Sequence, residues 1–156
     1  MANERRGIVI APEQGTLWNM TEDRFANLKL FGAQTGDTLA VFEETVPVET
    51  DTLLHLHHDS DETIYVLEGE IAIRIGEQVQ RGGPGTWAFI PRQTAHAWKN
   101  VGAAAARAMF IFTPAKAARF FEELSRQPAP INELDPNTIT ALLHESGWAI
   151  LGPSGL

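Results

Sequence analysis

Three histidines and one glutamate have the spacing of a metal site. His55 and His57 are alternate residues of a predicted strand, so both imidazoles point to one side, about 6.6–7 Å apart at the backbone. Glu62 follows a short polar loop that can return the chain beside this strand, and His96 can approach from a separate segment. This ligand set suits Fe(II), Mn(II), Ni(II), Co(II), Cu(II) or Zn(II).

The composition excludes several other kinds of site. The chain has 156 residues with five histidines and no cysteine, which rules out disulfides, thiolate zinc sites, iron–sulfur clusters and thiol nucleophiles. Its net charge of −8 argues against binding to nucleic acid or to an anionic membrane surface. We find no signal peptide and no apolar stretch long enough to span a bilayer, so we expect a cytoplasmic protein.

The segments that carry these residues are predicted to be short β-strands. Closely spaced strands without helical patterns between them favour an antiparallel sandwich or barrel. A tight turn at Gly69 is expected to join two of the strands. The predicted strands are Gly7–Ala11, Asn27–Gly32, Thr38–Val46, Thr52–His57, Thr63–Leu67, Ile71–Ile75, Thr86–Ile90 and Ala106–Thr113.

Beyond Pro114 the pattern changes to helical. A first helix carries an apolar stripe at Ala117, Phe120, Phe121 and Leu124, which we expect to pack outside the barrel or at a dimer contact. A second helix begins with Asp135 as N-cap and ends at Ser146 and Gly147. We expect one domain over residues 1–156, with a barrel core at about 27–113 and a helical appendage at about 114–156.

Two motifs in the central region resemble those of the cupin superfamily. The first is His55-x-His57-x4-Glu62-x6-Gly69, and the second is Gly85-x5-Pro91-x4-His96-x3-Asn100. Two residues depart from the family pattern: Glu49 and Gln93 stand where the family often has glycine. Both lie at turn or strand-entry positions, so they affect the expected loop geometry more than the ligand set. Features outside the motifs resemble small single-domain bacterial cupins that are compared with quercetin dioxygenases.

The resemblance implies a fold, a site and an activity. The fold is all-β, a double-stranded β-helix or jelly-roll barrel, here with two short C-terminal helices. His55, His57, Glu62 and His96 would be the ligands of one divalent transition metal, and Glu62 would also act as the catalytic base on a substrate hydroxyl. The resemblance further implies an enzyme, a metal-dependent dioxygenase that works as a homodimer.

The neighbours of these residues predict an apolar pocket. Strand alternation places Leu53, Ile64 and Trp98 on the same side as His55, Glu62 and His96, respectively. Phe42, Phe89 and Phe110 are further candidates to line the pocket, although core packing is the simpler role for any one of them. We therefore expect a small apolar or aromatic ligand, such as an aromatic or enol-containing molecule.

Three functions remain open from the sequence. The first is an oxygenase, in which the metal binds the substrate oxygen and O2. The second is a non-redox isomerase, cyclase or lyase, in which the metal polarises a carbonyl or stabilises an enolate. The third is a small-molecule-binding protein without catalysis.

Overall fold

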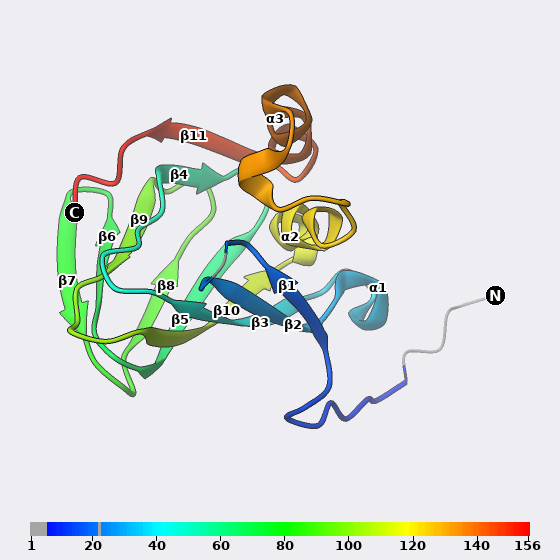
Figure 1. Ribbon diagram of the computed structural model, residues 1–156, viewed down its shortest axis with the longest axis horizontal. Helices are drawn as coiled ribbons and strands as arrows, with labels where there is room; N and C mark the ends of the chain where they lie inside the picture. Colours follow the sequence, from blue (N-terminus) through cyan, green and yellow to red (C-terminus); the bar gives the residue numbers. More distant parts are fainter. Residues whose placement is uncertain (1–5, 22) are drawn as a thin grey trace.

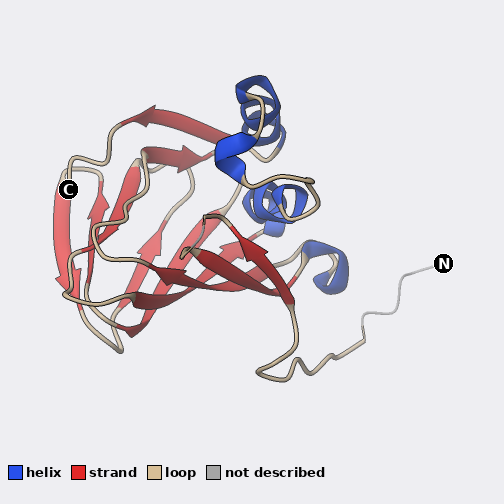
Figure 2. Ribbon diagram, in the orientation of Figure 1, coloured by secondary structure: helices blue, strands red, loops and turns tan. Residues whose placement is uncertain are grey.

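The computed structural model describes residues 6–21 and 23–156, and this part of the chain forms two antiparallel β-sheets that face each other (Figures 1 and 2). The six-stranded sheet has the order β1 (Thr16–Asn19), β2 (Phe25–Leu30), β3 (Ala40–Val46), β10 (Ala106–Thr113), β5 (Asp61–Glu68), β8 (Trp87–Ile90). The five-stranded sheet has the order β11 (Trp148–Gly152), β4 (Leu54–His57), β9 (His96–Asn100), β6 (Ile71–Ile75), β7 (Gln78–Gly82). The predicted double-stranded β-helix is confirmed.

Alternation along the central strands creates the core between the sheets. Burial alternates residue by residue along β3, β5 and β10, as a strand with one face inward requires. Phe42 on β3 stacks on Phe110 of β10, with ring centroids 5.0 Å apart. These strands were all predicted, because their alternating apolar residues carry the signal.

The turn between β5 and β6 shows why the first motif ends in glycine. Gly69 has a φ of +80°, in the left-handed region that favours glycine. A Cβ at this position would lie 2.7 Å from the Cβ of Ala106. The predicted tight turn is confirmed, and its glycine is required both by conformation and by space.

Helical segments lie at one end of the sheets, and the last of them adjoins β11 (Figure 1). They are α1 (Gly32–Thr35), η1 (Ala115–Ala118), α2 (Arg119–Leu124), η2 (Ile131–Glu133) and α3 (Pro136–Glu145). Asp135 and Pro136 occupy the predicted N-cap and first-turn positions of α3, although the Asp135 side chain makes no capping hydrogen bond. No helix of the described residues is long and apolar enough to cross a membrane.

Several expectations about the elements were wrong. Residues 7–11 are not a strand. The stripe of the first helix does not pack outside the barrel: Phe121 contacts Phe42 at 4.6 Å between ring centroids, and Phe120 and Phe121 line an internal cavity. The helix follows β10 directly through η1, which turns its apolar face toward the open end of the barrel. Strands β1, β7, β9 and β11 are not among the predicted strands, although His96 was expected on a separate segment that can approach the site.

Candidate metal centre

Four side chains converge between the two sheets. One potential ligand atom from each of His55, His57, Glu62 and His96 lies within 4.8 Å of those of the other three, and all four residues are buried. The structure therefore brings together the four residues that the sequence singled out. They form a group that could hold a metal ion.

Three strands position this group. His55 and His57 are the two buried residues of β4, whose alternation turns both inward. His55 pairs in register with His96, the first residue of β9. Glu62 lies on β5 in the opposite sheet and completes the group from the other side.

The loops around these strands are held by backbone hydrogen bonds. The Gln93 N–H donates to the His57 carbonyl oxygen at 2.7 Å, and the His58 N–H donates to the Gly147 carbonyl oxygen at 2.8 Å. Gln93 has a φ of +64° and Glu49 a φ of +62°. The two positions where the cupin pattern has glycine therefore do adopt the left-handed conformation that glycine favours.

Hydrogen bonds set the tautomers of two histidines. The Nδ1 atoms of His55 and His96 lie 2.7 Å and 2.9 Å from the carbonyl oxygens of Leu53 and Thr94. A carbonyl can only accept, so both Nδ1 atoms carry hydrogen and both Nε2 atoms face the group. A backbone acceptor on the second ring nitrogen is the usual support of a metal-binding histidine.

Glu62 pairs with two of the three histidines. Its Oε2 lies 2.9 Å from His57 Nε2 and 2.8 Å from His96 Nε2. Burial opposes the charged carboxylate, but the charge of His96 and hydrogen bonds from both imidazoles outweigh burial and lower the pKa of Glu62. Burial likewise opposes the imidazolium form of His96, and its pair with Glu62 outweighs this and raises the pKa of His96.

The other two histidines are held neutral. Burial, reinforced by the neighbouring His96, lowers the pKa of His55 to about 3. Burial also lowers the pKa of His57, against the hydrogen bond to Glu62, and its Nδ1 is buried without a hydrogen-bond partner among the described residues. Metal binding needs neutral imidazoles and an ionised carboxylate. His55, His57 and Glu62 already hold these states, and a bound cation would displace the proton that Glu62 favours on His96, so the donor set fits a divalent transition ion.

Trp148 contacts two of these histidines, although the sequence did not identify it. Its ring stacks on His55 at 4.7 Å between centroids and an interplanar angle of 14°, and it meets His57 edge-on at 4.2 Å. Its indole N–H donates to the Ala117 carbonyl oxygen at 2.9 Å. Only the pairing of β11 with β4 brings this distant residue to the site.

A cavity of about 310 Å³ opens from the group toward the helices, and His55 and Glu62 line it. Four of the six predicted pocket residues also line it: Leu53, Trp98, Phe42 and Phe110. The other two do not. Ile64 is fully buried in the core between the sheets, and Phe89 is 60% exposed, because β8 is an edge strand whose alternation turns Phe89 outward.

Several lining residues were not foreseen. Phe120 and Phe121 come from α2 and Trp148 from β11, whereas Glu44, Arg24 and Asp51 add charge to a mostly apolar wall. Glu44 lies two residues after Phe42 on β3, so strand alternation was a signal that could have placed it inside. His58 and His144, by contrast, are exposed, as expected.

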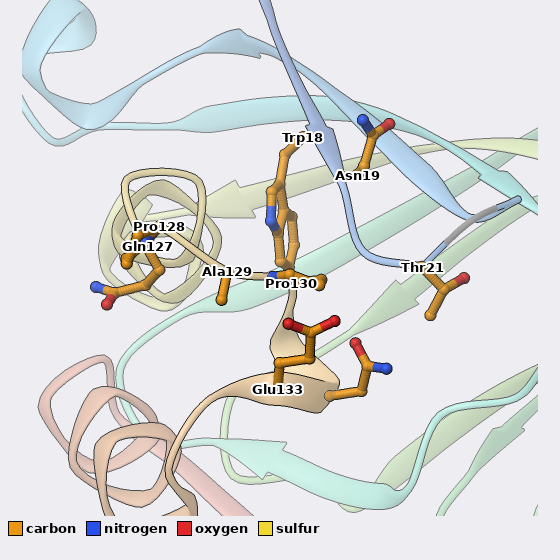
Figure 3. A pocket seen from close by; sticks show the side chains of 9 residues that line it. Trp18, Asn19, Thr21, Gln127, Pro128, Ala129, Pro130 and Glu133 are labelled. Atoms are coloured by element: carbon orange, nitrogen blue, oxygen red, sulfur yellow. The ribbon is translucent and has the colours of Figure 1, made fainter.

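A second cavity of about 590 Å³ is lined by Trp18 and by residues of the segment after α2 (Figure 3). The Trp18 ring points toward Ala129 and Pro130 in the segment after α2 (Figure 3). Trp18 and Thr21 line both cavities. The Trp18 side chain is therefore part of the wall between the metal-site cavity and this outer cavity.

Comparisons with known proteins agree with this geometry. Residues 42–112 match the cupin domain family. The uncharacterized protein MJ1618 of Methanocaldococcus jannaschii is 37% identical over 60 residues, which cover 38% of this chain and 48% of that protein. The chain thus matches about half the length of this curated relative.

Solved structures show the same fold. A cupin from Shewanella frigidimarina, described as RmlC-like, superposes with a TM-score of 0.60 at 16% identity and covers 71% of this chain and 95% of its own. A predicted oxalate decarboxylase from Thermotoga maritima superposes with a TM-score of 0.63 at 15% identity and covers 69% and 99%, respectively. With its two facing sheets and its inward His/His/Glu/His group, this chain has the fold of these cupin structures, and its central region is similar to the cupin domain family.

Proposed function

We propose that this protein is a metal-dependent enzyme of the dioxygenase type that acts on a small aromatic or enol-containing molecule. The observation that carries the proposal is the position of the His55, His57, Glu62 and His96 group at the inner end of a cavity with aromatic walls. Aromatic side chains bind flat apolar ligands, and a few polar groups orient them. The barrel strands and the C-terminal helices both line this cavity, so we propose that they act as one domain.

In this proposal the four residues hold one divalent transition metal, which supplies Lewis-acid or redox chemistry and binding positions for oxygen. The chain itself provides orientation and a proton acceptor. Trp98 and Phe110 contact each other at 5.4 Å between centroids and form a wall for the substrate ring. Glu62, which its partners keep ionised, accepts the proton of the substrate hydroxyl.

The first test is metal content. Protein purified without a histidine tag is compared with a His55→Ala/His57→Ala variant by elemental analysis, beside far-ultraviolet circular dichroism to confirm folding. We expect close to one transition metal per chain in the unaltered protein and a loss of most of it in the variant. Equally low metal in both proteins would refute the site.

The second test is oxygen uptake. Metal-loaded protein is screened with flavonols and enediols in an oxygen electrode, and products are followed by mass spectrometry. We expect O2 consumption in step with substrate loss. Turnover without O2 uptake would refute the oxygenase and indicate a non-redox isomerase, cyclase or lyase. Glu44 favours this alternative, because it is a second buried carboxylate that lines the cavity. Binding without conversion would leave a non-catalytic binding protein.

The homodimer is also a proposal. Trp87 and Phe89 on the edge strand β8 are both 60% exposed, and Trp87 stacks on Tyr65 at 4.2 Å. Exposed aromatic residues at a sheet edge favour contact with a second chain. Light scattering after size exclusion should give twice the mass of one chain, and a Trp87→Glu/Phe89→Glu variant should give the monomer mass.

A further inference from the structure

Besides Glu62 and Asp51, the mostly apolar lining of the cavity includes the charged pair Arg24 and Glu44. Glu44, on β3, is 2% exposed, and Arg24 immediately precedes β2. The Arg24 Nε–H donates to Glu44 Oε1 at 2.7 Å, and the guanidinium carbon lies 5.5 Å from the centroid of the Trp98 ring. The proposed dioxygenase reaction assigns no role to this pair.

The pair is more polar than packing requires. Removing a carboxylate from water is costly, and a buried ion pair is often no more stable than apolar residues of the same volume. Phe42, two residues earlier on β3, shows that an apolar side chain fits this face of the strand. A carboxylate here therefore favours a role in recognising a ligand.

The hydrogen bonds of Glu44 leave an acceptor available. Arg24 donates to Oε1, whereas Oε2 has no donor among the described residues and is not a fully enclosed atom. Burial, which outweighs Arg24, raises the pKa of Glu44, and a carboxylate with higher proton affinity is a stronger acceptor. Because Glu44 lines the cavity, a bound molecule can reach it.

We propose that Glu44, oriented by Arg24, determines specificity by accepting a hydrogen bond from a second hydroxyl of the substrate. The substrate class is then an aromatic or enol compound with two oxygens, one near Glu62 and one at Glu44, and its ring lies beside Trp98. The inference rests on the proposed function and deepens it. A hydroxyl fits better than an anion, because Glu44 and Glu62 place two carboxylates on the same cavity.

The test uses two rigid probes that differ by one hydroxyl, 2-naphthol and 2,6-dihydroxynaphthalene. Their dissociation constants are measured by calorimetry on zinc-loaded and zinc-free protein. A hydrogen bond to a charged acceptor corresponds to a preference for the diol of about 10-fold or more. Glu44→Gln keeps the shape and an acceptor for Arg24, and we expect it to reduce the preference to about threefold or less, because a neutral amide is a weaker acceptor.

Glu43→Gln is the matched control. Glu43 is the preceding residue on β3, faces away from the cavity and pairs with Arg107 at 3.2 Å. We expect it to keep the full preference for the diol. Equal binding of both probes by the unaltered protein, binding of neither probe, or an unchanged preference in Glu44→Gln would each overturn the proposal.

Two further measurements separate the possible failures. If 6-hydroxy-2-naphthoic acid binds more tightly than the diol, Arg24 recognises an anion and the hydroxyl proposal is wrong. The zinc-free titration is independent of the metal, so a diol preference that depends on Glu44 survives there even if the metal function fails. Conversely, metal content and O2 uptake test the proposed function whether or not Glu44 selects the diol.

Discussion

Replacing Gln93 by glycine should stabilise the protein, because the loop before His96 holds this residue in a conformation that suits glycine. Gln93 has a φ of +64°, and a non-glycine residue in this region costs about 1–2 kcal/mol. Its side chain is exposed and makes no hydrogen bond with the described residues, so the substitution removes no contact. The N–H that donates to the His57 carbonyl oxygen is kept.

The magnitude follows from two opposing effects. Glycine removes the strain of the left-handed conformation. This gain is partly offset by the greater conformational entropy that glycine has in the unfolded chain, which costs about 0.5–1 kcal/mol. The net gain in the free energy of unfolding is then about 0.5–1 kcal/mol. For a chain of this length, this corresponds to a rise in Tm of about 1–4 °C.

The assay is urea unfolding followed by tryptophan fluorescence, with a thermal scan beside it. Gln93→Ala is the control, since alanine keeps the unfavourable φ and removes the same side chain. We expect the free energy of unfolding and the Tm of Gln93→Gly to exceed those of both the unaltered protein and Gln93→Ala. Glu49→Gly, at a φ of +62°, should gain less, because it also removes the ion pair with Lys99 at 2.7 Å. If the glycine variant is no more stable than the alanine variant, the conformational argument is wrong.

Three more predictions concern the site and its supports. Trp148→Phe keeps a ring on His55 but leaves the Ala117 carbonyl without its donor. We expect zinc affinity, measured by chelator competition, to fall about 10-fold or more. Unchanged zinc affinity would contradict a role of Trp148 in positioning the histidines. Asn100 is fully buried, and the two N–H groups of its amide are shared among three carbonyl oxygens. Asn100→Asp should therefore unfold at lower urea than Asn100→Ala, since a carboxylate repels those oxygens, and the reverse order would refute this reasoning. Phe121→Ala should enlarge the cavity and lower the free energy of unfolding by about 2–4 kcal/mol. In calorimetry, the same variant should bind bulkier aromatic probes more tightly than the unaltered protein does.

The sequence predicted the barrel and the pair His55 and His57 from local periodicity, and it predicted the full set with Glu62 and His96 from the resemblance of its two motifs to those of cupins. Alternation along β3, β5 and β10 identifies the inward faces, and His-x-His on a strand places two imidazoles on one side. The same rule misplaced Ile64 and Phe89 with respect to the cavity. Alternation gives the side of a strand, but the position of the strand within its sheet decides whether that side faces a cavity, the packed core or the surface.

What the tertiary structure decided is the environment of the metal group. Trp148 follows His55 by more than ninety residues in the sequence, and only the register of β11 on β4 places its ring on the imidazole. The end of the barrel is likewise closed by Phe120 and Phe121 on a helix that we expected to lie outside. The residue types and spacing of the two motifs, whose candidate ligands lie on β4, β5 and β9, determined the chemistry of the site. The pairing of distant segments, which depends on the packing of the whole chain, decided which side chains surround the site, including the charged pair of Arg24 and Glu44.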